Sequence, residues 1–375
     1  MLRRYISLFI IVAITSFNSY AFETKAQYAV LMDYETGKVL FEKDANEEMK
    51  PSSMTKLMTV YLLFERLKND ILKLDDKFTV SVKAWKTGGS KMFLRHTERV
   101  TIEDLIKGIV VQSGNDACVT VAEGISSSEE SFAELMNKKA KELGLANSHF
   151  VNSTGLPHEN HYMSALDIAK LSHHIIRDFP DYYHYFSIPK FTHAGITQQN
   201  RNLLLAREIA VDGLKTGHTE DAGYGMAVSG TQEGRRLIAV VNGLNSEMAR
   251  TDEAEKLLNY GFRYFENRTL YKKGDIIEKA EVWSGTQDKV SLVTTQDITL
   301  MIPKLKSNDI KITLEYDSPI AAPINKGDQL ATLNINIPDS ESKSFTLVAG
   351  ADVDRANWLI RAIDSAKSYF IGSLE

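Results

Sequence analysis

The spacing of hydrophobic residues changes near residue 270, and this change divides the chain into two parts. After residue 268 the apolar runs are short, and Gly, Pro, Asn or Asp separates each run from the next. Before it, apolar residues recur at helical intervals over about 54–67, 101–112, 130–143, 164–178 and 247–264. Helices and strands require different hydrophobic periods. We therefore predict a mixed domain at 22–267 and a small all-β domain at 268–352.

Strand-like runs lie on both sides of the predicted helices. They cover 28–32 and 39–41 around a turn at 35–38, and later 224–231 and 237–244. The last run is almost entirely apolar, which predicts a strand buried on both faces. Strands, then helices, then strands with a closing helix are typical of an α/β or α+β domain.

The first 21 residues have the composition of an export signal. Arg3 and Arg4 precede an apolar run at 5–17, and the small residues Ser19 and Ala21 stand where a signal peptidase cleaves. The run is short for a helix that spans a bilayer. We predict a signal peptide at 1–21 and an exported, periplasmic protein, with an uncleaved N-terminal anchor as the alternative.

The last residues, 353–375, predict an amphipathic helix. One face carries Trp358, Leu359, Ala362, Ile363, Ala366, Tyr369 and Phe370, and charged or polar residues form the other. This pattern suits a helix that lies in the membrane interface. We therefore predict peripheral attachment to the outer face of the cytoplasmic membrane, with a helix docked on its own domain as the alternative.

Charge and cysteine content narrow the classes of partner and site. The net charge of −5 argues against a nucleic-acid partner. A single cysteine, Cys118, allows no intrachain disulfide and no multi-cysteine metal site; we expect it to be buried and structural. His158 and His161 lack the H-E-x-x-H spacing. No metal or cofactor is expected.

An S-x-x-K motif at the start of the first long helix predicts a nucleophile and its base. Residues three apart share a helix face, so the Ser53 hydroxyl and the Lys56 amine can meet. A lysine whose pKa is lowered by burial can take the proton of a serine. Two further S-x-x-K sequences begin at Ser187 and Ser340, but neither leads into a helical pattern.

Two later motifs complete an ordered set. Ser113-Gly114-Asn115 follows the helix predicted at 101–112, and the 215–217 segment, K-T-G, enters the strand-rich half. A cation, a hydroxyl and a glycine at a strand edge suit an extended peptide that ends in a carboxylate, with the glycine allowing close approach. A second K-T-G at 86–88 lies in a loop pattern.

The order S-x-x-K, S-x-N, K-T-G is the signature of penicillin-binding proteins and class A β-lactamases. The chain therefore resembles penicillin-recognising serine acyl-transferases, and further segments make it similar to the low-molecular-mass D-alanyl-D-alanine carboxypeptidases. Those segments are 22–26, 51–59, 88–93, 113–118, 152–157, 201–204 and 212–219. The resemblance implies a penicillin-binding/β-lactamase-like α/β domain, a β-rich domain and a membrane-associating tail.

The resemblance also implies catalytic roles. Ser53 would attack the penultimate D-Ala of a peptidoglycan stem peptide and form an acyl-enzyme, and β-lactams would acylate it as covalent inhibitors. Lys56 would accept the serine proton, and Ser113 would relay a proton to the leaving D-Ala. Asn115 would hold the substrate amide.

The remaining roles concern substrate binding. Lys215 would supply positive potential and Thr216 a hydroxyl for the terminal carboxylate, with Arg201 assisting. The backbone N–H groups of Ser53 and His218 would form the oxyanion hole, next to Gly217.

Other functions remain open from the sequence. A D,D-endopeptidase that cleaves crosslinked peptidoglycan would use the same residues. A class A β-lactamase needs a glutamate that activates water, and the stretch 149–162 offers Glu159 in a different context. A non-catalytic wall scaffold predicts broken motifs, whereas all three are intact.

Overall fold

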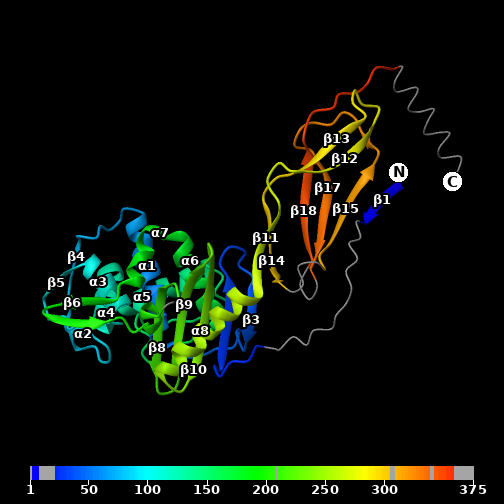
Figure 1. Ribbon diagram of the computed structural model, residues 1–375. Coiled ribbons are helices and arrows are strands. Elements are labelled where there is room, and N and C mark those ends of the chain that lie inside the picture. Colours follow the sequence, from blue (N-terminus) through cyan, green and yellow to red (C-terminus); the bar gives the residue numbers. More distant parts are fainter. Residues whose placement is uncertain (1, 8–21, 208, 305–308, 338–341, 359–375) are drawn as a thin grey trace. The chain divides into compact units, whose positions relative to one another are not determined.

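The computed structural model describes residues 2–7, 22–207, 209–304, 309–337 and 342–358. The chain divides into two compact units, one of them Tyr20–Arg263. The other contains the strand β1 (Leu2–Ser7) and the residues from Tyr264 onward (Figure 1). Each unit has its own hydrophobic core.

The first unit is built on a five-stranded antiparallel sheet with strand order β3-β2-β10-β9-β8. The strands are β2 (Tyr28–Asp33), β3 (Val39–Lys43), β8 (Val211–Thr219), β9 (Gly223–Gln232) and β10 (Arg235–Leu244). β10 is central, and its residues 237–242 are all buried. The predicted hairpin and the strand buried on both faces are therefore confirmed.

Helices cover both faces of this sheet. They are α1 (Lys56–Lys68), α2 (Val82–Lys86), α3 (Ile102–Val110), α4 (Asn115–Ser126), α5 (Glu129–Glu142), α6 (Ala165–Asp178), α7 (Pro180–Tyr183) and α8 (Glu247–Tyr264). Ile238 and Val240 of β10 join the core with α1 and α3 to α6. Leu237 and Ala239 join a second core with α8. Successive side chains of β10 point to opposite faces of the sheet, so the sheet lies as a middle layer between two layers of helices.

Short elements complete the first unit. They are the 3-10 helices η1 (Ser52–Thr55), η2 (His184–Ser187) and η3 (Leu203–Ala206), and the strand pairs β4 (Lys77–Thr79) with β5 (Arg99–Thr101) and β6 (Lys190–His193) with β7 (Ile196–Gln199). Hydroxyl groups cap the start of five helices: Ser81, Thr101, Ser128, Ser164 and Ser246 each accept a backbone N–H of the first turn.

The second unit is β-rich, as predicted. A seven-stranded sheet has the order β1-β15-β17-β18-β13-β12-β16, and β11 pairs with β14. The bounds are β11 (Phe265–Tyr271), β12 (Ile276–Trp283), β13 (Lys289–Thr294), β14 (Ile298–Pro303), β15 (Lys311–Ser318), β16 (Ile320–Ala321), β17 (Gln329–Asn336) and β18 (Lys343–Ala349). β1, which lies within the predicted signal peptide, pairs with β15. Its removal would leave β15 at the edge.

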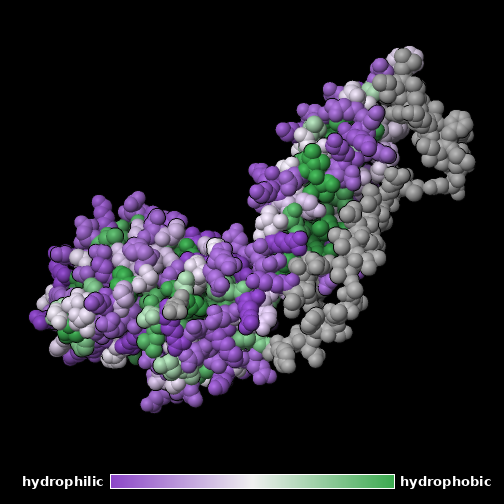
Figure 2. Space-filling view, in the orientation of Figure 1, coloured by the Kyte–Doolittle hydropathy of each residue, from purple (hydrophilic) through white to green (hydrophobic). Residues whose placement is uncertain are grey.

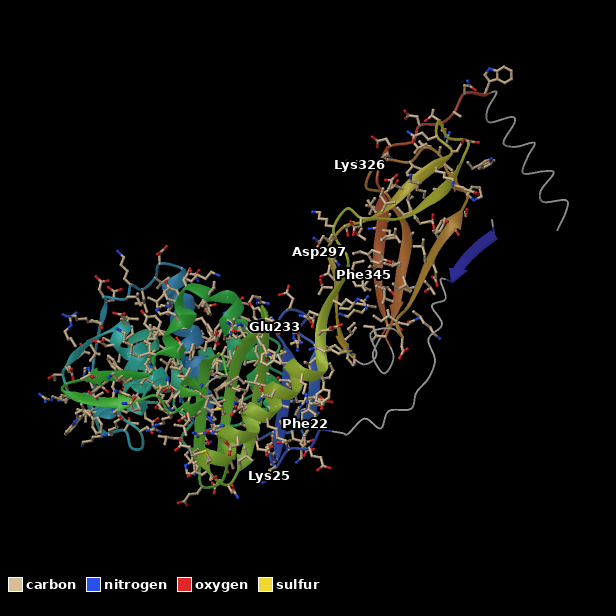
Figure 3. The ribbon with its side chains drawn as sticks, viewed as in Figure 1. Phe22, Lys25, Glu233, Asp297, Lys326 and Phe345 are labelled. Atoms are coloured by element: carbon tan, nitrogen blue, oxygen red, sulfur yellow. The ribbon has the colours of Figure 1, made fainter. Side chains whose placement is uncertain are left out.

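Hydrophilic and hydrophobic residues are distributed differently on the surfaces of the two units. In the face shown, hydrophilic residues cover most of the first unit, and a strip of hydrophobic residues follows the strands of the second (Figure 2). Phe345 of β18, a partly buried residue packed against the second core, is labelled among these strands (Figure 3). None of the helices within the described residues has the length and apolar character needed to cross a bilayer.

The predicted C-terminal helix falls almost entirely on 359–375, which lie outside the described residues. Trp358, the last described residue, leaves 73% of its side chain exposed.

Candidate active site

The nucleophile and its base meet at the junction of η1 and α1. Nζ of Lys56 donates hydrogen bonds to Oγ of Ser53 at 2.8 Å and to the carbonyl oxygen of Thr154 at 2.6 Å. Ser53 stands in the 3-10 turn, two residues before the N-cap of α1, while Lys56 is the first residue of the helix. The predicted pairing is therefore present, with the serine in a 3-10 turn rather than in the helix.

The environment of Lys56 favours its neutral form. The side chain is fully buried, and burial lowers its pKa from 10.5 to about 8. The positive charge of Arg201 lowers the pKa further, whereas Cys118 and Asp116 oppose the shift. With a pKa near 8, about a tenth of the amine is unprotonated at pH 7 and about half at pH 8, so a neutral form that can accept the Ser53 proton is populated.

Ser113 and Asn115 lie at the start of α4. Oγ of Ser113 is buried and has no hydrogen-bond partner within the described part of the chain. A hydroxyl in that state is available to a substrate group or a proton. Asn115 is hydrogen-bonded to the loop at 88–93: its Nδ2 donates to Gly88 O at 2.8 Å, and its backbone N–H donates to Ser90 O at 2.7 Å.

Asp116 holds this loop in place, a role that the sequence analysis missed. Its completely buried carboxylate accepts the backbone N–H groups of Met92 at 2.9 Å, Leu94 at 3.1 Å and Ala117 at 3.0 Å. A carboxylate is the acceptor best suited to several converging donors. The carboxylate thereby positions the segment that carries the partners of Asn115.

Lys215 and Thr216 lie on β8, the edge strand of the sheet. Lys215 is 3% exposed, and its Nζ donates to Thr216 O at 3.0 Å. Burial lowers the pKa of Lys215 well below its usual value, and the charges of Lys56, Arg201 and Arg250 act in the same direction. The positive charges of Lys56, Arg201 and Arg250 that lower this pKa also attract an incoming carboxylate, whose negative charge would favour the charged form of Lys215.

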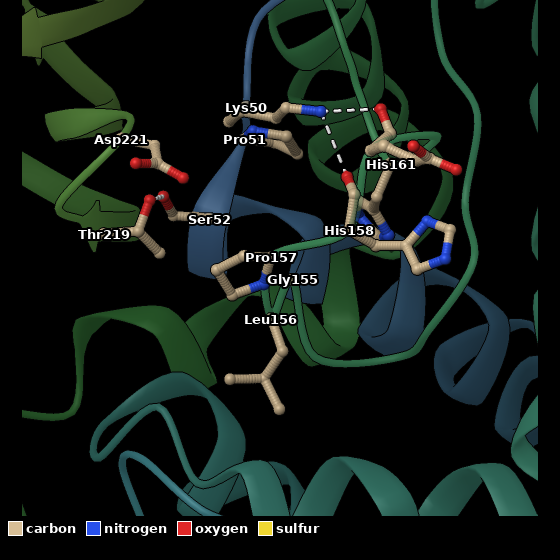
Figure 4. A pocket seen from close by; sticks show the side chains of 11 residues that line it. Lys50, Pro51, Ser52, Gly155, Leu156, Pro157, His158, His161, Thr219 and Asp221 are labelled. Carbon is tan, nitrogen blue, oxygen red and sulfur yellow. Dashed lines mark hydrogen bonds between the residues drawn. The ribbon is translucent and has the colours of Figure 1, made fainter.

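Close packing accounts for the glycine at position 217. A Cβ there would lie 2.9 Å from Pro51 O and 3.2 Å from Cβ of Ser52. The missing side chain lets β8 pack against the turn before Ser53. Oγ of Ser52 and Oγ1 of Thr219 lie 3.2 Å apart across the same contact (Figure 4).

Arg201 and His218 stand at the border of the site. Nη1 of Arg201 donates to Oγ of Ser90 at 2.8 Å, which links it to the Asn115 loop. The exposed ring of His218 stacks on Tyr224 with centroids 3.9 Å apart. Arg250 lies 3.4 Å from Arg201 O and 3.5 Å from Gly217 O, and it also pairs with Glu247. Arg250 thereby links the segment that carries Arg201 to the segment that carries Gly217.

Two titratable residues near the site are structural. Cys118 is a free, buried thiol whose pKa burial raises to about 12, so it is unreactive. His161 accepts the N–H of Val151 at Nδ1, which places its proton on Nε2, 2.9 Å from Oγ1 of Thr55. Burial lowers the pKa of His161 to about 3. Within the described ranges, no cluster of three or more His, Cys, Asp or Glu side chains could hold a metal.

Comparison with known proteins adds independent information. Residues 15–246 match the family described as D-alanyl-D-alanine carboxypeptidase, and residues 265–355 match the C-terminal domain of penicillin-binding protein 5. The chain is 38% identical over 343 residues to D-alanyl-D-alanine carboxypeptidase DacC of Escherichia coli, covering 89% of this chain and 86% of that protein.

Solved structures agree with these matches. Penicillin-binding protein 5 from Haemophilus influenzae superimposes with a TM-score of 0.80 at 37% identity, covering 90% of this chain and 100% of that one. Penicillin-binding protein D2 of Listeria monocytogenes, solved in its ampicillin-bound form, gives 0.58 at 28% identity, covering 65% of this chain and 100% of that one.

Proposed function

This chain belongs to the D-alanyl-D-alanine carboxypeptidase family, and on that premise we propose how its residues carry out the reaction. The protein is a serine-type D-Ala-D-Ala carboxypeptidase, a hydrolase of the penicillin-binding class. It removes the terminal D-alanine from peptidoglycan stem pentapeptides, and β-lactams acylate the same serine.

In the first half-reaction, Oγ of Ser53 attacks the carbonyl carbon of the penultimate D-Ala, and Lys56 takes the hydroxyl proton. Backbone N–H groups of Ser53 and His218 stabilise the oxyanion. When the peptide bond breaks, the proton held by Lys56 passes through the Ser113 hydroxyl to the nitrogen of the leaving D-alanine, which leaves Lys56 neutral and Ser113 as a hydroxyl. Water then attacks the ester, and its proton returns through Lys56 to Ser53 Oγ.

Substrate binding falls to the groups along β8 and its neighbours. Lys215, Thr216 and Arg201 receive the terminal carboxylate, whose charge suits their shared positive potential. Asn115 orients the substrate amide. Gly217 keeps β8 close to the nucleophile turn, so the carboxylate site and the serine are held at a constant separation.

One observation carries this proposal: the buried amine of Lys56 lies 2.8 Å from Oγ of Ser53, with a pKa near 8. An ordinary lysine, protonated at neutral pH, could not act as the base. The same residues can serve endopeptidase cleavage of crosslinked wall, which the digestion of crosslinked muropeptides would reveal.

The test is the mass of the intact mature protein after incubation with benzylpenicillin. We expect a persistent adduct of one drug molecule, together with D-alanine release from stem pentapeptide. Ser53→Ala should lose both, whereas Ser187→Ala, in the S-x-x-K sequence at 187–190, should keep both. Complete hydrolysis of the drug would indicate a β-lactamase. An absence of both adduct and D-alanine release would indicate a scaffold.

We further propose that the chain is exported and held at the membrane surface. The basic and apolar pattern of 1–21 supports export, and the exposed Trp358 at the start of the amphipathic segment supports attachment. The periplasmic, membrane-bound fraction should contain the full chain. A chain ending at 352 should appear in the soluble periplasmic fraction, and equal membrane binding by both would refute the attachment.

A further inference from the structure

Asp212 lies on β8, shortly before the K-T-G segment, at a point where the strand departs from regular pairing with β9. Val211 is paired with Gly230 and Gly213 is paired with Ser229, so Asp212 is an extra residue between two consecutive pairs. Such a β-bulge redirects the side chain of the extra residue and shifts the register of the strand that follows. The roles proposed above give Asp212 no function.

The bulge determines which face of the sheet Lys215 occupies. Lys215 lies opposite Ala227, whose side chain belongs to the core shared with α1. If the pairing before the bulge continued unchanged, Lys215 would lie opposite Met226, whose side chain belongs to the core shared with α8. Residues directly opposite each other in a sheet share a face. A register without the bulge would therefore turn Lys215 away from the nucleophile.

The carboxylate of Asp212 is held by three hydrogen bonds. Nη1 and Nη2 of Arg236 donate to Oδ1 at 2.7 Å and to Oδ2 at 2.6 Å, and Oη of Tyr183 donates to Oδ1 at 2.7 Å. Two-point contacts between a guanidinium and a carboxylate are stronger and more directional than neutral hydrogen bonds. Arg236 comes from β10, two strands away, and its Nη1 also donates to Oγ of Ser229 on the intervening β9 at 2.7 Å. The bulge is thus fastened across the sheet.

The surroundings leave this contact little room to move. Tyr183, at the end of α7, is buried, and Cζ of Arg236 lies 5.3 Å from the centre of its ring. A Cβ at Gly213 would lie 2.6 Å from Oη of Tyr183, so the glycine allows the phenol to reach the bulge. On the other side, Nδ2 of Asn202 donates to Gly213 O at 3.0 Å. The bulge is therefore also linked to the segment that carries Arg201.

We propose that Asp212 is a positioning residue for the reaction: held by Arg236 and Tyr183, it locks the bulge of β8 and thereby places the K-T-G segment against the substrate carboxylate. The inference rests on the proposed function, because Asp212 acts through the carboxylate-binding role given there to Lys215 and Thr216. Loss of its contacts lets the K-T-G segment move and leaves the nucleophile and its base in place. Recognition of the carboxylate is then weakened more than the chemistry at the serine.

The experiment compares acylation by benzylpenicillin with acylation by its methyl ester, which lacks the carboxylate. In the wild type we expect the second-order rate constant to be about 10- to 100-fold higher for the acid, as for hydrogen bonds to a charged group. Asp212→Asn keeps the size of the side chain but loses its charge and one acceptor. It should lower this preference about three- to ten-fold by slowing the acid and not the ester. Because both rates come from one preparation, their ratio does not depend on the fraction of folded protein.

Arg236→Lys is the second variant, since it keeps the positive charge and gives up the two-point contact. It should lower the preference for the acid by a similar factor, and it tests the proposal even if Asp212→Asn does not fold. The double variant should lower the preference no further than either single change, because the two residues act as one unit. Losses that add in the double variant would contradict this.

Asp33→Asn is the matched control. Asp33 is completely buried and lies 3.5 Å from Nε of Arg235, the neighbouring arginine on β10. Its loss should lower stability and leave the preference for the acid unchanged. An equal fall in this control would overturn the positioning role, as would a wild-type preference in both Asp212→Asn and Arg236→Lys.

Two results with the wild type distinguish this inference from its premise. Equal rates for the acid and the ester would remove the carboxylate-binding role of the K-T-G segment, and the positioning role of Asp212 with it. If neither compound acylated the wild type, the proposed function itself would fail.

Discussion

Nζ of Lys56 lies between two oxygen acceptors, 2.8 Å from Oγ of Ser53 and 2.6 Å from the carbonyl oxygen of Thr154. The carbonyl comes from a loop nearly a hundred residues later in the chain. It fixes the direction of the amine, so that the base points at the nucleophile before a substrate arrives. Reaction rate and fold stability should therefore both respond to the protonation of this one side chain.

The rate of acylation should rise with pH through about 8. Burial lowers the pKa of Lys56 to that value, and only the neutral amine can take the Ser53 proton. This pH dependence can be measured by following acylation by a β-lactam in a stopped-flow instrument from pH 6 to 10. Lys56→Met should reduce the rate by at least about a thousand-fold and abolish this dependence. A midpoint of the acylation rate above pH 10 would contradict a lowered pKa of Lys56.

Stability should also increase with pH, over a defined window. Below pH 8 Lys56 is protonated in both folded and unfolded chains, so its titration adds no slope. Between 8 and 10.5 the unfolded chain binds more protons, and the free energy of unfolding rises with pH. The gain is about 3 kcal/mol, measured by urea unfolding at pH 7 and 10 relative to Lys56→Met. If the free energies of unfolding of the wild type and of Lys56→Met differed by the same amount at pH 7 and pH 10, the predicted contribution of Lys56 would be contradicted.

Gly155→Ala should damage both the fold and the site. Gly155 has φ +80°, and a Cβ would lie 1.8 Å from the carbonyl oxygen of Ser52, so the residue before Ser53 must move. We expect a loss of more than about 2 kcal/mol in the free energy of unfolding, together with slow penicillin acylation.

Gly144→Ala separates the two causes of this effect. Gly144 has φ +68° and no atom within 4 Å of an added Cβ. This variant therefore reports the backbone cost alone, about 1 kcal/mol, and should acylate normally. Equal losses of stability in the two variants would show that the contact between Gly155 and Ser52 is unimportant.

Asp116→Asn should loosen the loop that holds Asn115. The amide has one acceptor oxygen, so at least one of the N–H groups of Met92 and Leu94 loses its partner. We expect a loss of about 1–3 kcal/mol, measured by urea unfolding, and a lower kcat for D-alanine release. Asp75→Asn, at an exposed position, should change neither quantity. Unchanged stability in Asp116→Asn would refute the positioning role.

Hydrophobic periodicity predicted most elements because most of them have one exposed face. The helix expected at 247–264 has those same bounds, and the β-rich runs after 268 all fall on strands. α4 was not among the predicted helices. Its residues 115–122 are all buried, so no polar face alternates with an apolar one. A helix surrounded by protein leaves no amphipathic signal.

The motif order predicted which residues meet, but not how they are held. The spacing of Ser53 and Lys56 is local, and so is readable in the sequence. The acceptor at Thr154 and the role of Gly217 depend on contacts between segments separated by about a hundred residues or more. The partners of Asp212 come from α7 and β10, and only the folded chain brings them to one carboxylate.

The position of β2 within the sheet has a consequence for biogenesis. β2 is the first strand of the catalytic domain, yet it pairs with β10, and Thr24 just before it hydrogen-bonds to Glu253 across 229 positions of sequence. Such non-local pairing is slow to form, because the intervening chain must be present first. Under the proposed export, a chain that enters a translocation channel by its N-terminus would leave β2 without its partner β10 until about 200 further residues had been synthesised.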